Sequence, residues 1–114
     1  DMMSDLMITI IGKGYDVKYD GANPLGIDRY VVKINSTYGL SVLVSDSDPG
    51  FFGFGGAYSG EGTVEVGLLK DGVYVGSGPN SHPVPDEFND NGAIACYVGE
   101  DRLFRIIKKV EALQ

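Results

Sequence analysis

The chain has 114 residues, a length typical of one domain, and 43% of them are hydrophobic and 22% charged. This composition supports a packed core and excludes disorder of the chain as a whole. Sixteen acidic residues against nine basic ones give a net charge of −7, so we expect neither direct nucleic-acid binding nor membrane-surface binding.

The first half of the chain predicts one helix followed by three strands. Residues 4–14 place apolar side chains at helical spacing, although the β-branched run at 8–11 leaves a strand open as the alternative. Residues 15–20 alternate Tyr or Val with charged residues, which indicates a strand. Residues 29–35 and 40–45 are the next two strands, and the polar residues between them predict a hairpin.

The second half predicts two long loops around a short hairpin. Residues 46–62 are rich in glycine and aromatic residues, and residues 77–92 hold three prolines. Between these loops, Asp71-Gly72 signals a tight turn, because both residue types accept positive φ. Strands are expected on both sides of this turn and after the second loop, at residues 63–69, 73–76 and 93–98.

The last helix is the clearest element of the sequence. Over residues 101–113 apolar side chains recur on one helical face, at Leu103, Ile106, Ile107, Val110 and Leu113. We therefore expect an α+β fold, a single domain over residues 1–114. Its mainly antiparallel sheet of about five to six strands would carry an N-terminal and a C-terminal helix on one face.

The search for catalytic and metal-binding motifs leads to no catalytic residue, metal or cofactor. Residues 87–92 resemble the first half of a calcium loop, but Val98 stands where such a loop needs a bidentate carboxylate. The one His and the one Cys, His82 and Cys96, would be the basis of the alternative function, a small hydrolase or transferase. Cys96 lies inside a predicted strand, not at a helix start where a thiolate is stabilised, and we expect it to be buried and inert.

Two features are candidates for binding. The first is the glycine-rich loop that carries Phe51, Phe52, Phe54 and Tyr58, whose rings would either contact a partner or close the edge of the core. The second is a basic helix face opposite the apolar stripe, made of Arg102, Arg105, Lys108 and Lys109, with the plain alternative that this face is simply solvated.

The opening of the chain resembles small acidic α+β proteins encoded by phages and prophages. The resemblance rests on the apolar first segment, on residues 14–19 and 29–35, and on the strand that ends at 43–48, so it covers about the first 45 residues. Some acidic Cas9 inhibitors of phages similarly begin with a helix and a three-stranded meander. Past Asp48 the chain departs from that pattern, so the acidic interface of those inhibitors is not carried over to residues here.

These observations favour a non-enzymatic protein-binding module of phage or prophage origin, with a protein partner. The alternatives are the small hydrolase or transferase and a structural or assembly component of a virion. One cysteine excludes an internal disulfide and the longest apolar run is too short to cross a bilayer, so we expect a cytoplasmic protein. The partner's identity and the oligomeric state stay open.

Overall fold

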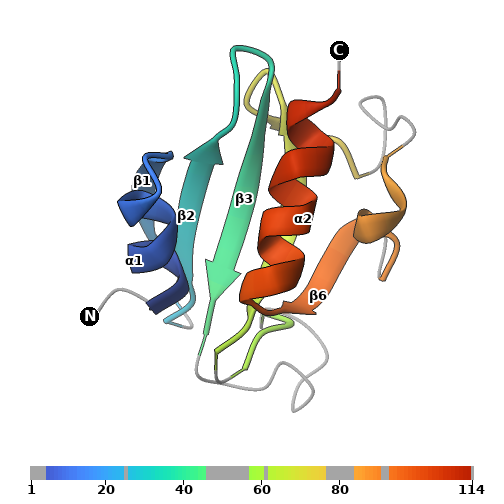
Figure 1. The fold of residues 1–114 in the computed structure, drawn as a ribbon. Coiled ribbons are helices and arrows are strands. Elements are labelled where there is room, and N and C mark those ends of the chain that lie inside the picture. The colour runs from blue at the N-terminus through green and yellow to red at the C-terminus, as the bar shows by residue number, and fades with distance from the viewer. Residues whose placement is uncertain are drawn as a thin grey trace.

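The computed structural model describes residues 5–24, 26–45, 57–60, 62–76, 84–90 and 93–113. They form two α-helices and a six-stranded antiparallel sheet, so the α+β fold expected from the sequence is confirmed (Figure 1). The elements are, in chain order, α1 (Asp5–Gly12), β1 (Asp16–Ala22), β2 (Asp28–Lys33), β3 (Tyr38–Val44), β4 (Val64–Lys70), β5 (Val73–Tyr74), the 3-10 helix η3 (Asp86–Phe88), β6 (Ile94–Val98) and α2 (Glu100–Glu111).

The sheet follows the chain from β1 to β4 as a meander. Its order is β1-β2-β3-β4, and the side of β4 away from β3 is shared by two strands. β5 pairs with Leu69 and Lys70, while β6 pairs with the opposite part of β4, from Val64 to Gly67. Every pairing is antiparallel, in agreement with the mainly antiparallel sheet that the sequence predicted.

Both helices pack on the same face of the sheet (Figure 1). From α2, the side chains of Leu103, Ile106, Ile107 and Val110 are fully buried, and they meet alternate residues of the strands such as Val32, Leu40, Val42, Val66 and Leu68. The apolar residues repeat about every 3.6 positions in the helix and every 2 in the strands, so they face each other and form one common core, as the sequence predicted. Neither described α-helix covers the opposite face of the sheet, which we call the helix-free face.

The elements run along one axis, which gives the molecule two ends. We call the hairpin end the one where β2 turns into β3 and where Asp71 and Gly72 join β4 to β5. We call the loop end the one where β3 stops at Val44, β4 starts at Val64 and α2 starts at Glu100. Figure 1 shows the hairpin end at the top and the start of α2 at the bottom.

Some local expectations change in the structure. α1 is a helix, so the strand alternative for residues 8–11 is wrong. β1 continues past Asp20 through a bulge in which Gly21 has a φ of 94°, and Tyr19 is 49% exposed. A 3-10 turn that buries Phe88 lies in the second predicted loop. The sequence did not predict it, because a single apolar residue in a polar segment shows no periodicity.

Candidate functional site

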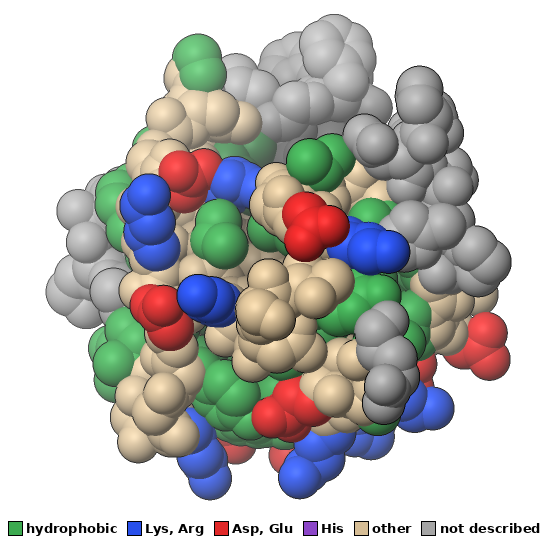
Figure 2. All heavy atoms as spheres, turned by 90° about the horizontal axis from the view of Figure 1, so that it is seen from above, with side chains coloured by type: hydrophobic (Ala, Val, Ile, Leu, Met, Phe, Trp, Pro, Cys, Tyr) green, Lys and Arg blue, Asp and Glu red, His purple; other side chains and the backbone are tan. Residues whose placement is uncertain are grey.

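The lysines gather toward one end of the elements, whereas acidic side chains occur at both ends, with Asp16, Asp71 and Glu111 near the lysines. Both helices begin at the loop end with carboxylates, Asp5 in α1 and Glu100 and Asp101 in α2, as the helix dipole favours. The antiparallel strands add to the pattern, since β2 starts with Asp28 at the loop end and finishes with Lys33 at the hairpin end. The lysines all lie in the half toward the hairpin end, at Lys13, Lys18, Lys33, Lys70, Lys108 and Lys109. Figure 2 looks onto the hairpin end and shows Lys and Arg side chains spread over it, with acidic ones between them.

The loop end is closed by a pair of buried serines. The Ser59 hydroxyl donates to the Ser45 carbonyl at 3.2 Å and accepts from the Ser45 amide at 3.0 Å. Ser45 follows β3, and Ser59 belongs to the short described segment before β4. One side chain thus satisfies two backbone groups that no strand pairing uses, and it fixes where the residues 57–60 lie.

Tyr58 and Tyr97 meet beside this pair of serines. The Tyr97 amide donates to the Tyr58 carbonyl at 2.8 Å, and the two rings pack edge to face with centroids 6.3 Å apart. Tyr97 has a φ of 51° at a point where the register of β4 and β6 shifts, and its side chain is 49% exposed. A bulky residue in the left-handed region is uncommon and costs about 1–3 kcal/mol, so the surrounding contacts hold this ring in place against strain.

Glu65 anchors the same segment from the helix-free face of the sheet. It is 7% exposed, and its Oε1 accepts a hydrogen bond from the Tyr58 amide at 2.9 Å. Burial raises the pKa of the Glu65 carboxyl, and the Tyr58 hydrogen bond opposes part of that rise. Because its main contact is a backbone amide, we read Glu65 as an anchor of the loop end rather than as a catalytic acid.

Cys96 does not have the surroundings of a nucleophile. Burial raises the pKa of the Cys96 thiol, Asp90 and Glu65 raise it further, and only Arg102 lowers it. A raised pKa keeps the thiol protonated at neutral pH, whereas catalytic cysteines need the thiolate. The side chain is half-buried, so it is more accessible than the sequence led us to expect.

Arg102, expected on the exposed basic face of α2, is turned toward the protein. Its guanidinium donates to the carbonyls of Cys96 at 3.1 Å and Glu87 at 3.0 Å, and it pairs with the Asp90 carboxylate at 2.8 Å. Asp90 in turn accepts the Cys96 amide at 2.9 Å. The pKa of Asp90 is held below its ordinary value, first by the Cys96 hydrogen bond and then by Arg102.

Of the remaining candidate residues, some lie on α2 and the others lie outside the described residues. Lys109 lies 3.8 Å from a Glu87 carboxylate oxygen, and Arg105 is exposed on α2. Phe51, Phe52 and Phe54 lie outside the described residues, and so does His82. Of the candidate aromatic loop, the structure therefore describes only its end at Tyr58.

The described part of the chain holds neither a cluster of metal ligands nor a helix that could span a membrane. No group of three or more His, Cys, Asp or Glu side chains comes together there to hold a metal ion. The candidate calcium loop is described only up to Asp90, since residues 91–92 lie outside the described ranges. Neither described helix has the length and apolar character needed to cross a bilayer.

The sequence did not indicate that Tyr97 is an exposed residue with positive φ, or that the lysines gather toward one end of the molecule. Both features depend on strand pairing. A bulge inside a short strand leaves no mark in the period-2 pattern, and the gathering of the lysines depends on the direction in which each strand runs. Comparison of the chain with protein-family models, curated proteins and solved structures finds no match.

Proposed function

We propose that the protein is a non-enzymatic protein-binding domain that docks its loop end on a basic surface of a partner protein. The observation that carries the proposal is the exposed Tyr97 ring, which a backbone with positive φ presents beside Tyr58 at the end of the molecule where both helices begin with carboxylates. The proposal includes the cytoplasm as its compartment and a phage or prophage origin, for which the sequence pattern is the support.

The aromatic pair has the character of a contact site. Tyrosine supplies a large apolar surface and a polar tip with few rotatable bonds, which is why it is enriched in binding hot spots. The backbone at Tyr97 keeps an unfavourable conformation while its ring stays half outside the protein. Strain at an exposed residue is characteristic of functional positions, since burial of the ring does not repay it.

The carboxylates at the loop end define the partner's chemistry. Glu100 and Asp101 are exposed, and they form no ion pair with any described residue. Exposed carboxylates steer and orient a basic partner, and an Arg guanidinium also stacks favourably on a Tyr ring. Acidic side chains and aromatic rings would therefore act together at one end of the molecule.

The enzymatic alternative receives no comparable support from the described residues. Of its two residues, His82 lies outside the described ranges, and the pKa of the Cys96 thiol is raised, first by burial. A hydrolase or transferase needs a nucleophile with a lowered pKa or an adjacent base.

The proposal is tested by selecting peptides from a random dodecapeptide library on the immobilised protein. We expect the selected peptides to contain Arg or Lys beside an apolar or aromatic residue. They should bind less tightly to a Tyr58→Ala, Tyr97→Ala variant and to a Glu100→Gln, Asp101→Asn variant, by roughly tenfold or more.

Two matched controls lie away from Tyr58, Tyr97 and the start of α2, since Tyr19 is on β1 at the opposite edge of the sheet. Tyr19 is as exposed as Tyr97, at 49%, and Asp71 is an exposed acid at the hairpin end. Tyr19→Ala and Asp71→Asn should leave the affinity of the selected peptides unchanged. Peptides that bind all of these variants equally well, or a library that yields no enriched sequence, would contradict the proposal.

A further inference from the structure

A hollow lies at the hairpin end of the molecule, on the helix-free face of the sheet. Cross-strand pairing aligns Asp16, Lys33, Gly39 and Leu69 in one row over β1 to β4. The next row contains Lys18, Val31, Ser41 and Gly67. Side chains alternate between faces along a strand, so both rows point away from the helices.

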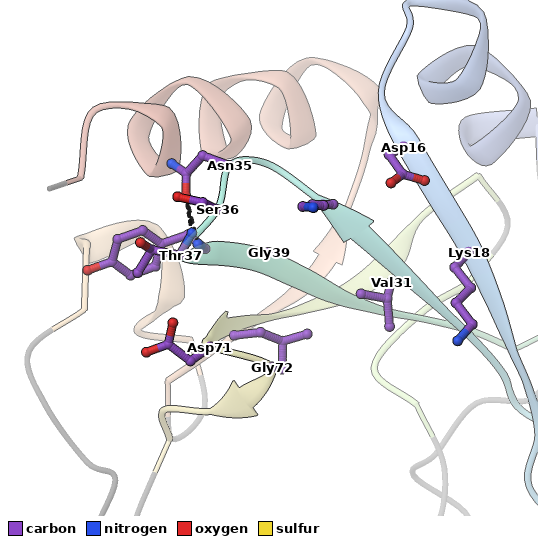
Figure 3. Close-up of a pocket in the computed structure, with 12 residues that line it drawn as sticks. Asp16, Lys18, Val31, Asn35, Ser36, Thr37, Gly39, Asp71 and Gly72 are labelled. Carbon is purple, nitrogen blue, oxygen red and sulfur yellow. Dashed lines mark hydrogen bonds between the residues drawn. The ribbon is translucent and has the colours of Figure 1, made fainter.

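The hollow in the sheet surface lies over Gly39. Gly39 has no side chain to fill it, and a Cβ at that position would lie 3.0 Å from the Val32 carbonyl oxygen. The hollow has a volume of about 340 Å³, in the range of small-molecule sites. Val31 and Leu69 supply apolar wall, and the turns at residues 35–37 and Asp71-Gly72 bound it on the hairpin side (Figure 3).

The turn at residues 35–37 is pre-organised. The Asn35 Oδ1 accepts the amides of Thr37 at 2.9 Å and of Tyr38 at 2.7 Å, which closes the turn at the edge of the hollow (Figure 3 draws the first of these bonds). The Asp71 amide donates to the Thr37 carbonyl at 2.8 Å and ties the second turn to the first. The walls are thus fixed without a ligand, which lowers the entropic cost of binding one.

Two lysines and two aspartates stand around the rim. Lys18 and Lys33 reach the hollow from β1 and β2, and Asp71 stands across it on the β4–β5 turn, while Asp16 is the cross-strand neighbour of Lys33. All four side chains are exposed, and within the described residues none of them forms an ion pair. By contrast, Arg29 on the same face is paired with Asp20.

We propose that this hollow binds a small free monocarboxylate with an apolar body. The two lysines would hold the carboxylate, since charge-assisted hydrogen bonds from ammonium groups are the strong ones. Val31 and Leu69 would cover the apolar body, and Asp71 at the far side would repel a second negative charge. The site is independent of the loop end, because the two lie at opposite ends of the strands.

The test is an NMR titration of the ¹⁵N-labelled protein with 4-phenylbutyrate as the probe. We expect saturable shifts in the amides of Val31, Lys33 and Gly39. The neutral 4-phenylbutanamide and the cationic 4-phenylbutylamine should bind more weakly by roughly tenfold or more, because they forfeit the contacts with two lysines. Equal binding of the amide or the amine would overturn the proposal, as would the absence of shifts at about 10 mM probe.

Three variants locate the effect. Lys18→Gln with Lys33→Gln should weaken 4-phenylbutyrate binding by roughly tenfold, and Val31→Phe should abolish it by filling the hollow. Lys108→Gln removes the same charge from the exposed face of α2 and should leave the affinity unchanged. The amide spectrum of each variant reports its folding directly. If the lysine and Val31 variants bind the probe as the wild type does, or if Lys108→Gln weakens binding as much as they do, the assignment is wrong.

Discussion

Tyr97 and Tyr58 are joined by a backbone hydrogen bond of 2.8 Å and by the edge-to-face packing of their rings, and Tyr97 accepts a φ of 51° to make both contacts. The relationship connects β6 with the segment that leads into β4. It places one exposed ring at the end of the molecule that carries the first-turn carboxylates of both helices. The backbone strain at Tyr97 can be measured as a difference in stability between variants.

Replacing Tyr97 by Gly or Ala separates the strain from the loss of the ring. Both variants lose the ring, but only Gly adopts positive φ without cost, so Tyr97→Gly should be more stable than Tyr97→Ala by about 1 kcal/mol. Urea unfolding measures the difference. At Tyr19, an exposed strand residue without positive φ, the order should reverse, with the Gly variant less stable than the Ala variant.

Glu65→Gln should change how stability depends on pH. Burial raises the pKa of Glu65, so the folded protein binds a proton more tightly at this site than the unfolded chain does. The contribution of Glu65 is therefore complete below its unfolded pKa, about 4.3, and is lost as pH rises through the higher folded pKa. The amide keeps an acceptor for Tyr58 without a charge. The stability of Glu65→Gln relative to wild type should thus increase from pH 4 to pH 7 in urea unfolding.

Asp90→Asn should change the pH dependence of stability in the opposite direction. The pKa of Asp90 is lowered, so this carboxylate stabilises the fold above its unfolded pKa, about 3.9, and the contribution disappears as pH falls through the folded pKa. At pH 7 the variant should lose about 1 kcal/mol, the ordinary size for a partly exposed charged hydrogen bond. Near pH 2 it should equal wild type. Parallel pH profiles for the Glu65 and Asp90 variants would contradict at least one of the two assignments.

Much of the fold was predictable from local patterns, whereas the two sites depend on pairing between distant strands. The apolar stripe of α2 specified its buried face, and Asp71-Gly72 specified the turn that the structure shows, with φ values of 51° and 80°. The inward course of Arg102 was not predictable, because its partners at Glu87, Asp90 and Cys96 lie in a turn and a strand that only the fold brings together. The hollow over Gly39 likewise requires the register of four strands.

Gly76 should tolerate no side chain. A Cβ at Gly76 would lie 1.9 Å from the Tyr74 ring, which also covers Gly67. Gly76→Ala would displace the ring or the chain, and we expect a loss of about 1–3 kcal/mol in the free energy of unfolding. Gly60→Ala is the matched control, because its Cβ would meet only the Thr63 hydroxyl at 3.7 Å, and its stability should stay within about 0.5 kcal/mol of wild type.

The central claim is that the loop end contacts a basic partner protein, and the most direct measurement is site-specific photocrosslinking in a cell lysate. A benzoylphenylalanine at position 97 should form adducts with one or a few proteins, identified by mass spectrometry as carrying basic surfaces. The yield should fall as salt is raised from about 0.05 to 0.5 M, because exposed charges are then screened. The same probe at position 19, which replaces a tyrosine of equal exposure, should form no specific adduct. Equal adducts at both positions, or no specific adduct at position 97 at either salt concentration, would contradict the account.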